Sequence, residues 1–301
     1  MARNNPWWST YQRWMFALGA LPALLMLGGA YFLPESPRWL IRQGRDDEAR
    51  AALARFRQPE RIEREFEGIR DITQQEDKRM GLRMILRSDR LRRLLLVGSG
   101  LGILQQLVGI NAITYYAPTV LKRIGFSNSE SILANFGFST LGLLMTGVML
   151  LFVVDKVGRR KPLIFGALGM SLSMAVLATV FSTGGAGTEA GYLSIACLAL
   201  FQVSFALSWG GMVWIMLGEM FPLRARGTAM GIAVFMTEMT SVVVGAVFPK
   251  LLAAAPATAF TGFAVMGIAA FLWAVFLVPE TKQRSLEDIE LDLDDSFTGG
   301  S

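Results

Sequence analysis

The chain has 301 residues, of which 52% are hydrophobic and 18% are charged, and its formal net charge at pH 7 is +5. This hydrophobic share, with a mean hydropathy of +0.42, exceeds what the core of a water-soluble protein requires. A single cysteine rules out a disulfide framework or a cysteine metal cluster, and the lack of histidine rules out serine–histidine catalysis and histidine proton relays. We therefore expect an integral membrane protein that is not an enzyme and uses neither a metal nor a cofactor.

Seven apolar segments follow one another along the chain, each long enough to cross the roughly 30 Å hydrocarbon layer of a bilayer as a helix. Glu238 is the only charged residue well inside any of them, which argues against a water-soluble helical bundle. The segments are Trp14–Leu33, Leu94–Leu121, Ile132–Val154, Pro162–Phe181, Tyr192–Leu217, Thr228–Leu252 and Ala257–Val278.

Positive charge is divided unequally between the two sides that seven alternating crossings define. All but five of the 29 lysines and arginines fall on the side that holds residues 41–93 and the C-terminal tail. Short cytoplasmic loops of membrane proteins are enriched in lysine and arginine, so this side is predicted to be cytoplasmic. The excess of basic residues therefore reflects topology and does not indicate binding of nucleic acid. The expected parts are the N-terminal segment with the first membrane helix (1–40), a cytoplasmic helical domain (41–93), a six-helix bundle (94–278) and a cytoplasmic tail (279–301).

The predicted position of the N-terminus, on the outer side, is awkward because residues 1–13 contain no apolar stretch that could direct their own translocation. A hydrophobic portion ahead of the first segment would remove the difficulty. We therefore expect the chain to correspond to part of a larger protein.

The cytoplasmic stretch shows two short amphipathic patterns. Asp46 can cap a helix that places Ala49, Ala52, Leu53 and Phe56 at helical spacing, and a second helix carries Ile62, Phe66 and Ile69. The stretch is too short and too polar for a large core. It predicts a helical hairpin rather than an independent binding domain.

Charged motifs recur at the predicted cytoplasmic ends of the membrane helices: PESPRWL (34–40), DKVGRRKP (155–162), GEMFPLRARG (218–227) and PETKQRSLEDIE (279–290). Each places a carboxylate beside an arginine or lysine. Ordinary positive-inside anchoring is one interpretation, but four such clusters on one side favour interhelical charge pairs that hold one closed state and break in another. The expected gating residues are a central group of Asp155, Arg159, Arg160, Glu219 and Arg226, with Glu35, Arg38 and Glu280 outside it.

The second apolar segment contains the sequence QQLVGINAITYYAPTV at 105–120. Its amides, Gln105, Gln106 and Asn111, tend to face a cavity or a partner, since unpaired polar groups in an apolar medium cost free energy. Gln106 and Asn111 would lie roughly 140° apart on a straight helix, so both can face one cavity only if the helix unwinds, which Gly109 permits. Tyr115 lies one turn beyond Asn111. The alternative is that the amides join neighbouring helices.

Taken in order, the QQLVGIN, GRR, R-x-RG and PETK motifs resemble the sugar porter family of the major facilitator superfamily. The resemblance covers about residues 14–290 and implies twelve membrane helices in two halves of six, with a helical intracellular domain between the halves. This chain is similar to the sixth helix, the intracellular domain and the complete second half, while helices one to five have no counterpart. The expected fold is thus an all-α integral membrane protein of this superfamily with about seven transmembrane helices.

The resemblance also implies site residues. Sugar porters bind substrate with the residues that match Gln105, Gln106 and Asn111, and Trp214 matches the tryptophan on which the sugar stacks. Trp209, Gly210 and Gly211 fall in the segment that resembles the discontinuous tenth helix of the family. A tryptophan at the lipid interface is the alternative for Trp214.

The chain departs from the family pattern at two positions. Leu143 stands where many relatives have a sugar-binding asparagine, and Glu238 stands where hexose carriers commonly have a tryptophan. A carboxyl in mid-membrane suggests function. Glu238 is therefore expected to face the central cavity, where it receives a substrate group or takes part in proton movement. The alternative is hydrogen bonding to the nearby hydroxyls of Thr237, Thr240 or Ser241.

The sequence predicts a multi-pass protein of the cell membrane that moves a sugar or polyol by alternating access and contacts membrane lipids. Proton coupling stays open, because the acid that couples protons in many relatives belongs to the first helix of the family. Alternating access needs two bundles, so a complementary N-terminal half or a second copy is an expected partner. The alternatives are a non-transporting, half-length membrane subunit or sensor, and an organic-ion carrier on the same fold.

Overall fold

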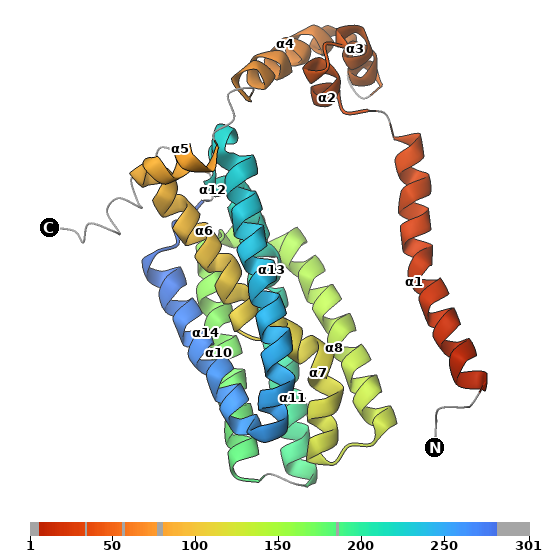
Figure 1. Cartoon of the computed structure of the whole chain (residues 1–301), viewed down its shortest axis with the longest axis vertical. Coiled ribbons are helices and arrows are strands. Elements are labelled where there is room, and N and C mark those ends of the chain that lie inside the picture. The colour runs from red at the N-terminus through yellow and green to blue at the C-terminus, as the bar shows by residue number, and fades with distance from the viewer. Residues whose placement is uncertain (1–5, 34, 56–57, 77–80, 185–186, 282–301) are drawn as a thin grey trace, which may run out of the picture. The chain divides into compact units, whose positions relative to one another are not determined.

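The computed structural model describes residues 6–33, 35–55, 58–76, 81–184 and 187–281 (Figure 1). All regular secondary structure in these residues is helical. The chain divides into two compact units, Met1–Lys78 and Arg79–Ser301. The predicted tail at 279–301 lies outside the described residues from position 282 onward.

The first unit begins with a long apolar helix, α1 (Pro6–Phe32), which contains the first predicted membrane segment except for its last residue, Leu33. The apolar stretch Phe16–Phe32 is shorter than the six membrane-spanning candidates of the second unit. Large apolar side chains are exposed all around it, as at Phe16, Leu25 and Phe32. A helix that is apolar on every side is suited to a lipid or protein environment rather than to water.

Three short helices complete the first unit: α2 (Pro37–Arg42), α3 (Asp46–Ala54) and α4 (Pro59–Glu76). They enclose a small core, as the spacing predicts, although Phe56 lies outside the described residues. The N-cap of α3 is Arg45, with Asp46 as the first helical residue. The core residues are Leu40, Ala49, Ala52, Leu53 and Phe66, with Ile41, Ile62 and Ile69 packed around them.

Arg50 fastens α3 to α4. Its guanidinium makes two hydrogen bonds to the carboxylate of Glu63, at 2.9 and 3.1 Å, and its central carbon lies 3.9 Å from the centre of the Phe66 ring. The ion pair therefore covers the edge of the small apolar core.

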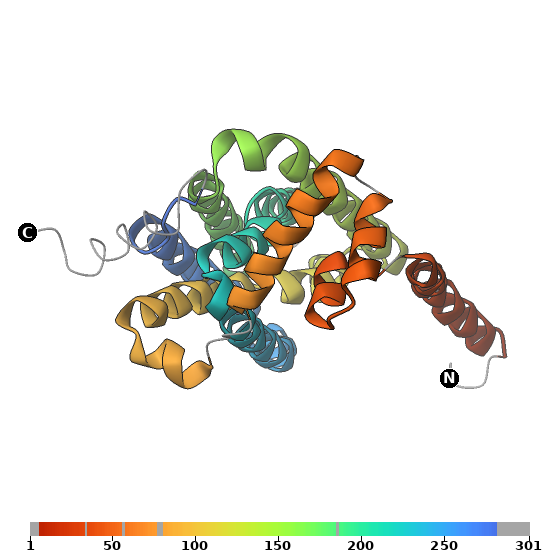
Figure 2. The same cartoon turned by 90° about the horizontal axis from the view of Figure 1, so that it is seen from above.

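The second unit is a bundle whose helices run roughly side by side in Figure 1 and are seen nearly end-on in Figure 2. Among the described residues, six helical stretches are long and apolar enough to cross a membrane: Asp89–Ile124, Asn128–Val157, Arg160–Ser182, Thr188–Met220, Ala225–Ala254 and Pro256–Phe276. Each contains one of the last six predicted segments, except that the final segment ends two residues earlier than predicted. The bundle helices are α5 (Leu82–Arg87), α6 (Asp89–Leu107), α7 (Ile110–Ile124), α8 (Asn128–Val148), α9 (Val154–Val157), α10 (Arg160–Ser182), α11 (Thr188–Ala206), α12 (Trp209–Met220), α13 (Leu223–Ala254) and α14 (Pro256–Phe276).

Three of these stretches are interrupted. One breaks at Gly109 between α6 and α7, and another at Ser208 between α11 and α12. Between α8 and α9 the chain forms a π-helical turn, Met149–Val153. Non-helical backbone at membrane depth is tolerated where protein surrounds it or where it lines a cavity, so the breaks mark candidate binding positions.

Small residues allow the bundle helices to approach closely. A Cβ added to Gly267 of α14 would lie 2.9 Å from the Cα of Ser171 in α10. The hydroxyl of Ser171 donates a hydrogen bond to the Ala264 carbonyl at 2.8 Å. The polar network of the candidate site comes from other helices, α6, α7 and α13.

Candidate functional site

The turn at Gly109 positions the candidate site. Its φ of +95° is left-handed, a conformation that only glycine adopts without strain. A Cβ at this position would also lie 2.8 Å from three atoms of the Phe263 ring. The helix thus ends at a residue that both its backbone angle and its neighbour require to be glycine.

Across this turn the amides of Gln106 and Asn111 meet. The Asn111 side chain donates hydrogen bonds from Nδ2 to Gln106 Oε1 at 2.9 Å and to Ser241 Oγ of α13 at 2.7 Å. On a straight helix the two amides would lie roughly 140° apart, so the break brings them together as predicted from Gly109. Both are largely shielded, with 8% of Gln106 exposed and Asn111 half-buried.

The remaining polar atoms of this network can serve a ligand. None of the hydrogen bonds among the described residues uses Asn111 Oδ1, which leaves it as an acceptor. The Ser241 hydroxyl accepts from Asn111, so its own hydrogen can be donated elsewhere. The sequence suggested Ser241 only as a possible hydrogen-bonding partner of Glu238. Its place beside Asn111 depends on helix packing that no local pattern indicates.

Gln105 points away from this network. It is buried, and its Nε2 donates to the carbonyl of Trp209 at 2.7 Å. The indole of Trp209 in turn donates to the Leu163 carbonyl of α10 at 2.9 Å. In this conformation Gln105 therefore links α6 to the second break, at Ser208.

The other three predicted substrate-binding residues are exposed, and so is Leu143. Tyr115 on α7 is 72% exposed, Trp214 on α12 is 39% exposed and Leu143 on α8 is 74% exposed. Glu238 on α13 is also exposed, three residues before Ser241 and hence on an adjoining part of the same helix face. Such large exposed aromatic and apolar side chains mark a surface suited to a ligand, lipid or further helices.

The alternative hypothesis for Glu238 is a hydrogen bond to a neighbouring hydroxyl. The hydrogen bonds among the described residues do not include one. Thr237 donates to the Ala233 carbonyl and Thr240 to the Met236 carbonyl, each at 2.8 Å, and Ser241 accepts from Asn111. Within the described part of the chain, no hydrogen bond or ion pair involves the Glu238 carboxylate. It is available to an external group.

A charge cluster joins the helix ends at the side predicted to be cytoplasmic. The carboxylate of Glu280 accepts from the backbone N–H groups of Arg159 and Arg160 at 3.0 and 3.2 Å, beside the N-terminus of α10. The Arg159 guanidinium donates to Glu219 Oε1 at 2.9 Å, and the Thr281 hydroxyl donates to the other oxygen of Glu219 at 2.5 Å. These contacts connect the α9–α10 turn, the end of α12 and the segment after α14.

The membership of this cluster differs from the expected central group. Glu280, expected outside the group, lies within it. The side chain of Arg160 donates to the carbonyls of Ala274 and Val275, and Arg226 donates to the Phe221 carbonyl at 3.0 Å. Asp155 is exposed and makes no hydrogen bond or ion pair with another described residue.

The other two predicted gating residues, Glu35 and Arg38, belong to the first unit. The sequence could not have assigned Glu280 to the cluster, because its partners are backbone groups 120 or more positions away.

The comparisons with known proteins decide the family. The profile of the family "Sugar (and other) transporter" matches residues 3–293. The chain belongs to this family. It is a multi-pass, all-α membrane protein of the major facilitator sugar porter type, as its motifs and its six apolar spans predict.

Individual relatives agree. The chain is 41% identical to the putative metabolite transport protein YwtG of Bacillus subtilis over 94% of its own length and 61% of that protein. It is 36% identical to the glucose transporter GlcP of Staphylococcus epidermidis, with 93% and 62% coverage. Among solved structures, the proton:xylose symporter XylE bound to 6-bromo-6-deoxy-D-glucose is 32% identical, with a TM-score of 0.75, over 93% of this chain and 58% of that one. The chain thus spans about three-fifths of the length of these proteins.

Proposed function

We propose that the chain contributes the substrate-binding bundle of a transporter that moves a sugar or polyol across the cell membrane by alternating access. Alternating access requires two bundles that rock about a shared site. The described residues supply one bundle of six spans, so the second would come from the rest of a longer protein, from a complementary half or from a second copy. The printed names of relatives support this solute class, since they include transporters of glucose, D-xylose and myo-inositol.

The observation that carries the proposal is the network of Gln106, Asn111 and Ser241 at the Gly109 break. Amides and hydroxyls offer both donors and acceptors, which matches a ligand whose every hydroxyl does both. The unused acceptor of Asn111 and the donor of Ser241 lie within apolar spans, where an unsatisfied polar group is costly. A bound polyhydroxylated solute would satisfy them. Trp214 and Tyr115 would supply aromatic surface for the apolar face of a sugar ring.

The cluster of Arg159, Glu219, Glu280 and Thr281 is proposed as a gate. Its hydrogen bonds connect three segments that belong to different helices, and such bonds can form in one state and break in another. Asp155, Arg160, Arg226, Glu35 and Arg38 remain predicted contributors. The distribution of positive charge supports a cytoplasmic position for the gate and the C-terminus.

Glu238 is proposed to contact the solute or to take part in proton movement. Relatives that are named as proton symporters, among them the galactose–proton symporter of Escherichia coli, support a test for coupling. In proteoliposomes, Glu238→Gln should change the pH profile of uptake. An unchanged rate and profile would contradict both roles.

Ligand binding is the first experiment. The purified full chain is incubated with radiolabelled glucose, xylose and myo-inositol, and retained label is measured with and without excess unlabelled ligand. Asn111→Ala should abolish displaceable binding, whereas Thr240→Ala, which removes a hydroxyl bonded only to its own helix, should keep it. Equal binding by both variants would overturn the assignment of the site.

Counterflow in proteoliposomes then separates the alternatives. When the second bundle is also present, exchange of labelled sugar across the bilayer supports a transporter, and sugar binding without exchange supports a subunit or sensor. If organic cations displace the label more strongly than sugars do, the chain is an organic-ion carrier on the same fold, with Glu238 as the charge that attracts the cation.

A further inference from the structure

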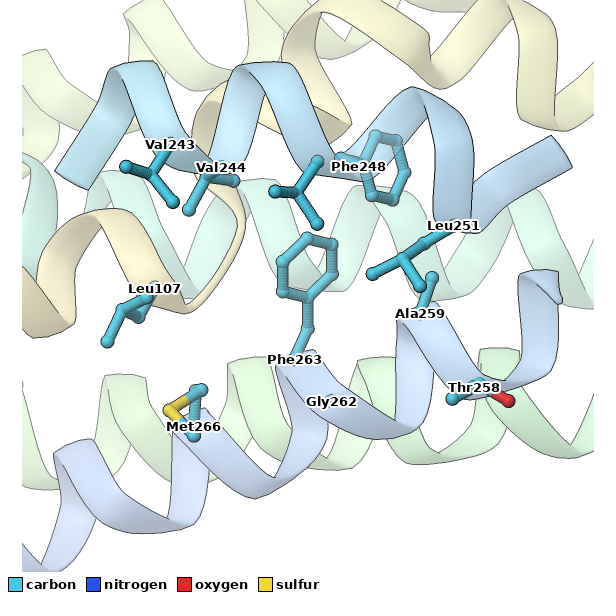
Figure 3. Close-up of a pocket in the computed structure, with 11 residues that line it drawn as sticks. Leu107, Val243, Val244, Phe248, Leu251, Thr258, Ala259, Gly262, Phe263 and Met266 are labelled. Carbon is cyan, nitrogen blue, oxygen red and sulfur yellow. The ribbon is translucent and has the colours of Figure 1, made fainter. Parts of the chain in front are cut away.

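An apolar cavity of about 250 Å³ lies between α13 and α14, beside the end of α6. Figure 3 shows Val244 and Phe248 of α13 facing Phe263 and Met266 of α14 across it. Apart from the hydroxyl of Thr258, the side chains that line it offer only hydrocarbon or a thioether. The cavity thus differs in chemistry from the amide network at Asn111, and none of the residues that line it belongs to that network.

The lining restricts what can occupy this space. A buried water needs two to four polar partners, and one hydroxyl at the margin does not provide them. The volume is below the roughly 300–1,000 Å³ of ordinary small-molecule sites. Val243 and Val247, which line the cavity, are 58% and 46% exposed, so it opens at the surface of two helices long enough to span a membrane. A hydrocarbon chain from the bilayer fits these conditions.

A positively charged residue of α13 lies next in sequence to residues that line the cavity. Lys250 is exposed, lies three residues after Val247 and one before Leu251, and is one turn from the end of α13 at Ala254. A lysine near a helix end places its ammonium group at the membrane interface. The sequence has no aspartate or glutamate between Glu238 and Glu280, so neither helix neutralises it nearby. Its charge is complementary to a lipid phosphate.

We propose that the acyl chain of an anionic phospholipid occupies this cavity, with the lipid phosphate beside Lys250. The acyl chain of the lipid would then pack against Phe263, whose ring stacks on the ring of Phe248 at 5.3 Å between centroids. The same ring lies against Gly109, at the turn that holds Gln106 and Asn111 together. The lipid site therefore adjoins the support of the candidate solute site without sharing its polar groups.

Photolabelling of the full chain tests the acyl part of the proposal. Proteoliposomes contain a phosphatidylglycerol with a diazirine in its acyl chain, and labelled peptides are identified by mass spectrometry after irradiation. Label is expected on peptides 243–251 and 258–266. Gly262→Leu should remove it, because a leucine there fills the cavity and a Cβ at Gly262 meets no heavy atom within 4 Å.

Gly137→Leu on α8 is the matched control, since its Cβ is equally unobstructed, and it should keep the label. Monodisperse elution and an unchanged melting temperature establish that each variant is folded. If Gly262→Leu fails this check, Val247→Phe, at an exposed lining position, replaces it. Persistent label in a folded cavity-filling variant, or lack of label on both peptides of the unaltered chain, would overturn the proposal.

The headgroup is tested separately. Lys250→Gln should reduce labelling by phosphatidylglycerol to the level that a phosphatidylcholine probe gives with the unaltered chain, while Lys122→Gln, another exposed lysine, should leave it unchanged. Equal labelling by the two probes in the unaltered chain would contradict an anionic lipid.

Discussion

Gly109 has two independent requirements, a left-handed φ and the contact with Phe263. Either one alone would disfavour a side chain. Together they fix the position at which α6 ends and α7 begins, and this fixes the approach of Asn111 to Gln106 and Ser241. The chemistry of the candidate site thus depends on a residue that has no side chain.

Replacing this glycine should damage both folding and binding. In Gly109→Ala, backbone strain alone costs about 1–3 kcal/mol, and the new Cβ must also displace the Phe263 ring. We expect a lower melting temperature in detergent and loss of sugar binding. Gly137→Ala, in an unobstructed helical position, should melt at the same temperature as the unaltered chain or at a higher one, because alanine stabilises a helix by about 1 kcal/mol relative to glycine. A Gly109→Ala variant that melts and binds like the unaltered chain would refute the dual requirement.

Ser241 offers a finer test of the network. Ser241→Ala removes one acceptor of Asn111 and one donor to the solute, so sugar affinity should fall by about 1 kcal/mol per lost hydrogen bond, roughly five-fold. Equilibrium binding measures the change. Thr240→Ala alters the adjacent residue, whose hydroxyl bonds within α13, and should bind normally. Equal affinities for the two variants would remove Ser241 from the site.

Among the helices, α10 begins without a capping hydrogen bond from its own N-cap side chain. Glu280, which lies beyond α14, serves as its cap. A carboxylate that accepts from the first N–H groups of a helix also interacts favourably with the helix dipole. Gly158, with φ +88°, brings the preceding turn close, since a Cβ there would lie 2.7 Å from the Glu280 carboxylate. The cap therefore joins the last described residues to the start of α10.

Removing this cap should lower stability. Glu280→Ala is expected to cost about 1–2 kcal/mol, measured as a lower melting temperature of the purified chain. Asp155→Ala removes a carboxylate from the same end of the bundle that is exposed and makes no contact of this kind among the described residues, so it should melt close to the unaltered chain. An equal fall in melting temperature for the two variants would show that any negative charge at this end stabilises the bundle, and that capping of α10 does not.

The link between α3 and α4 has a measurable electrostatic signature. The hydrogen bonds from Arg50 lower the pKa of the Glu63 carboxyl, and those from Arg45 lower the pKa of Glu48. Because the folded-state pKa of Glu63 is lowered, its contribution to stability is present above the ordinary glutamate pKa of about 4.3. It is lost as the pH falls through the lowered, folded-state pKa.

Titration by carbon-13 NMR of the glutamate carboxyls checks this assignment. Arg50→Gln should raise the pKa of Glu63 toward its ordinary value, while Glu48, which pairs with Arg45, should titrate as before. The assignment is wrong if Glu63 does not respond, or if both glutamates shift together.

For the molecule as a whole, the predicted orientation in the membrane depends on the unequal distribution of lysine and arginine between its two sides. The only cysteine, Cys197, is buried in α11, which makes site-directed labelling practical after Cys197→Ala. Lys122→Cys lies at the end of α7 predicted to be outside, and Lys161→Cys lies beside the charge cluster.

A membrane-impermeant maleimide should label Lys122→Cys in intact cells and Lys161→Cys only after permeabilisation. Both positions are exposed, so a difference between them reports the side of the membrane and not burial. The reverse pattern would invert the proposed topology and move the gate to the outer side.

The amino-acid sequence was enough to predict the membrane class, the positions of the last six spans and a glycine, Gly109, at which a helix can unwind, because hydropathy, helical spacing and glycine geometry are local properties. Its motifs also predicted the family that the comparisons show. Only the tertiary structure decided which groups meet. It joined Asn111 to Ser241 across 130 positions, turned Gln105 toward Trp209, brought Glu280 to the start of α10 and left Asp155 exposed. These pairings depend on how the helices pack and rotate against one another, and residues on separate helices carry no local pattern that records it.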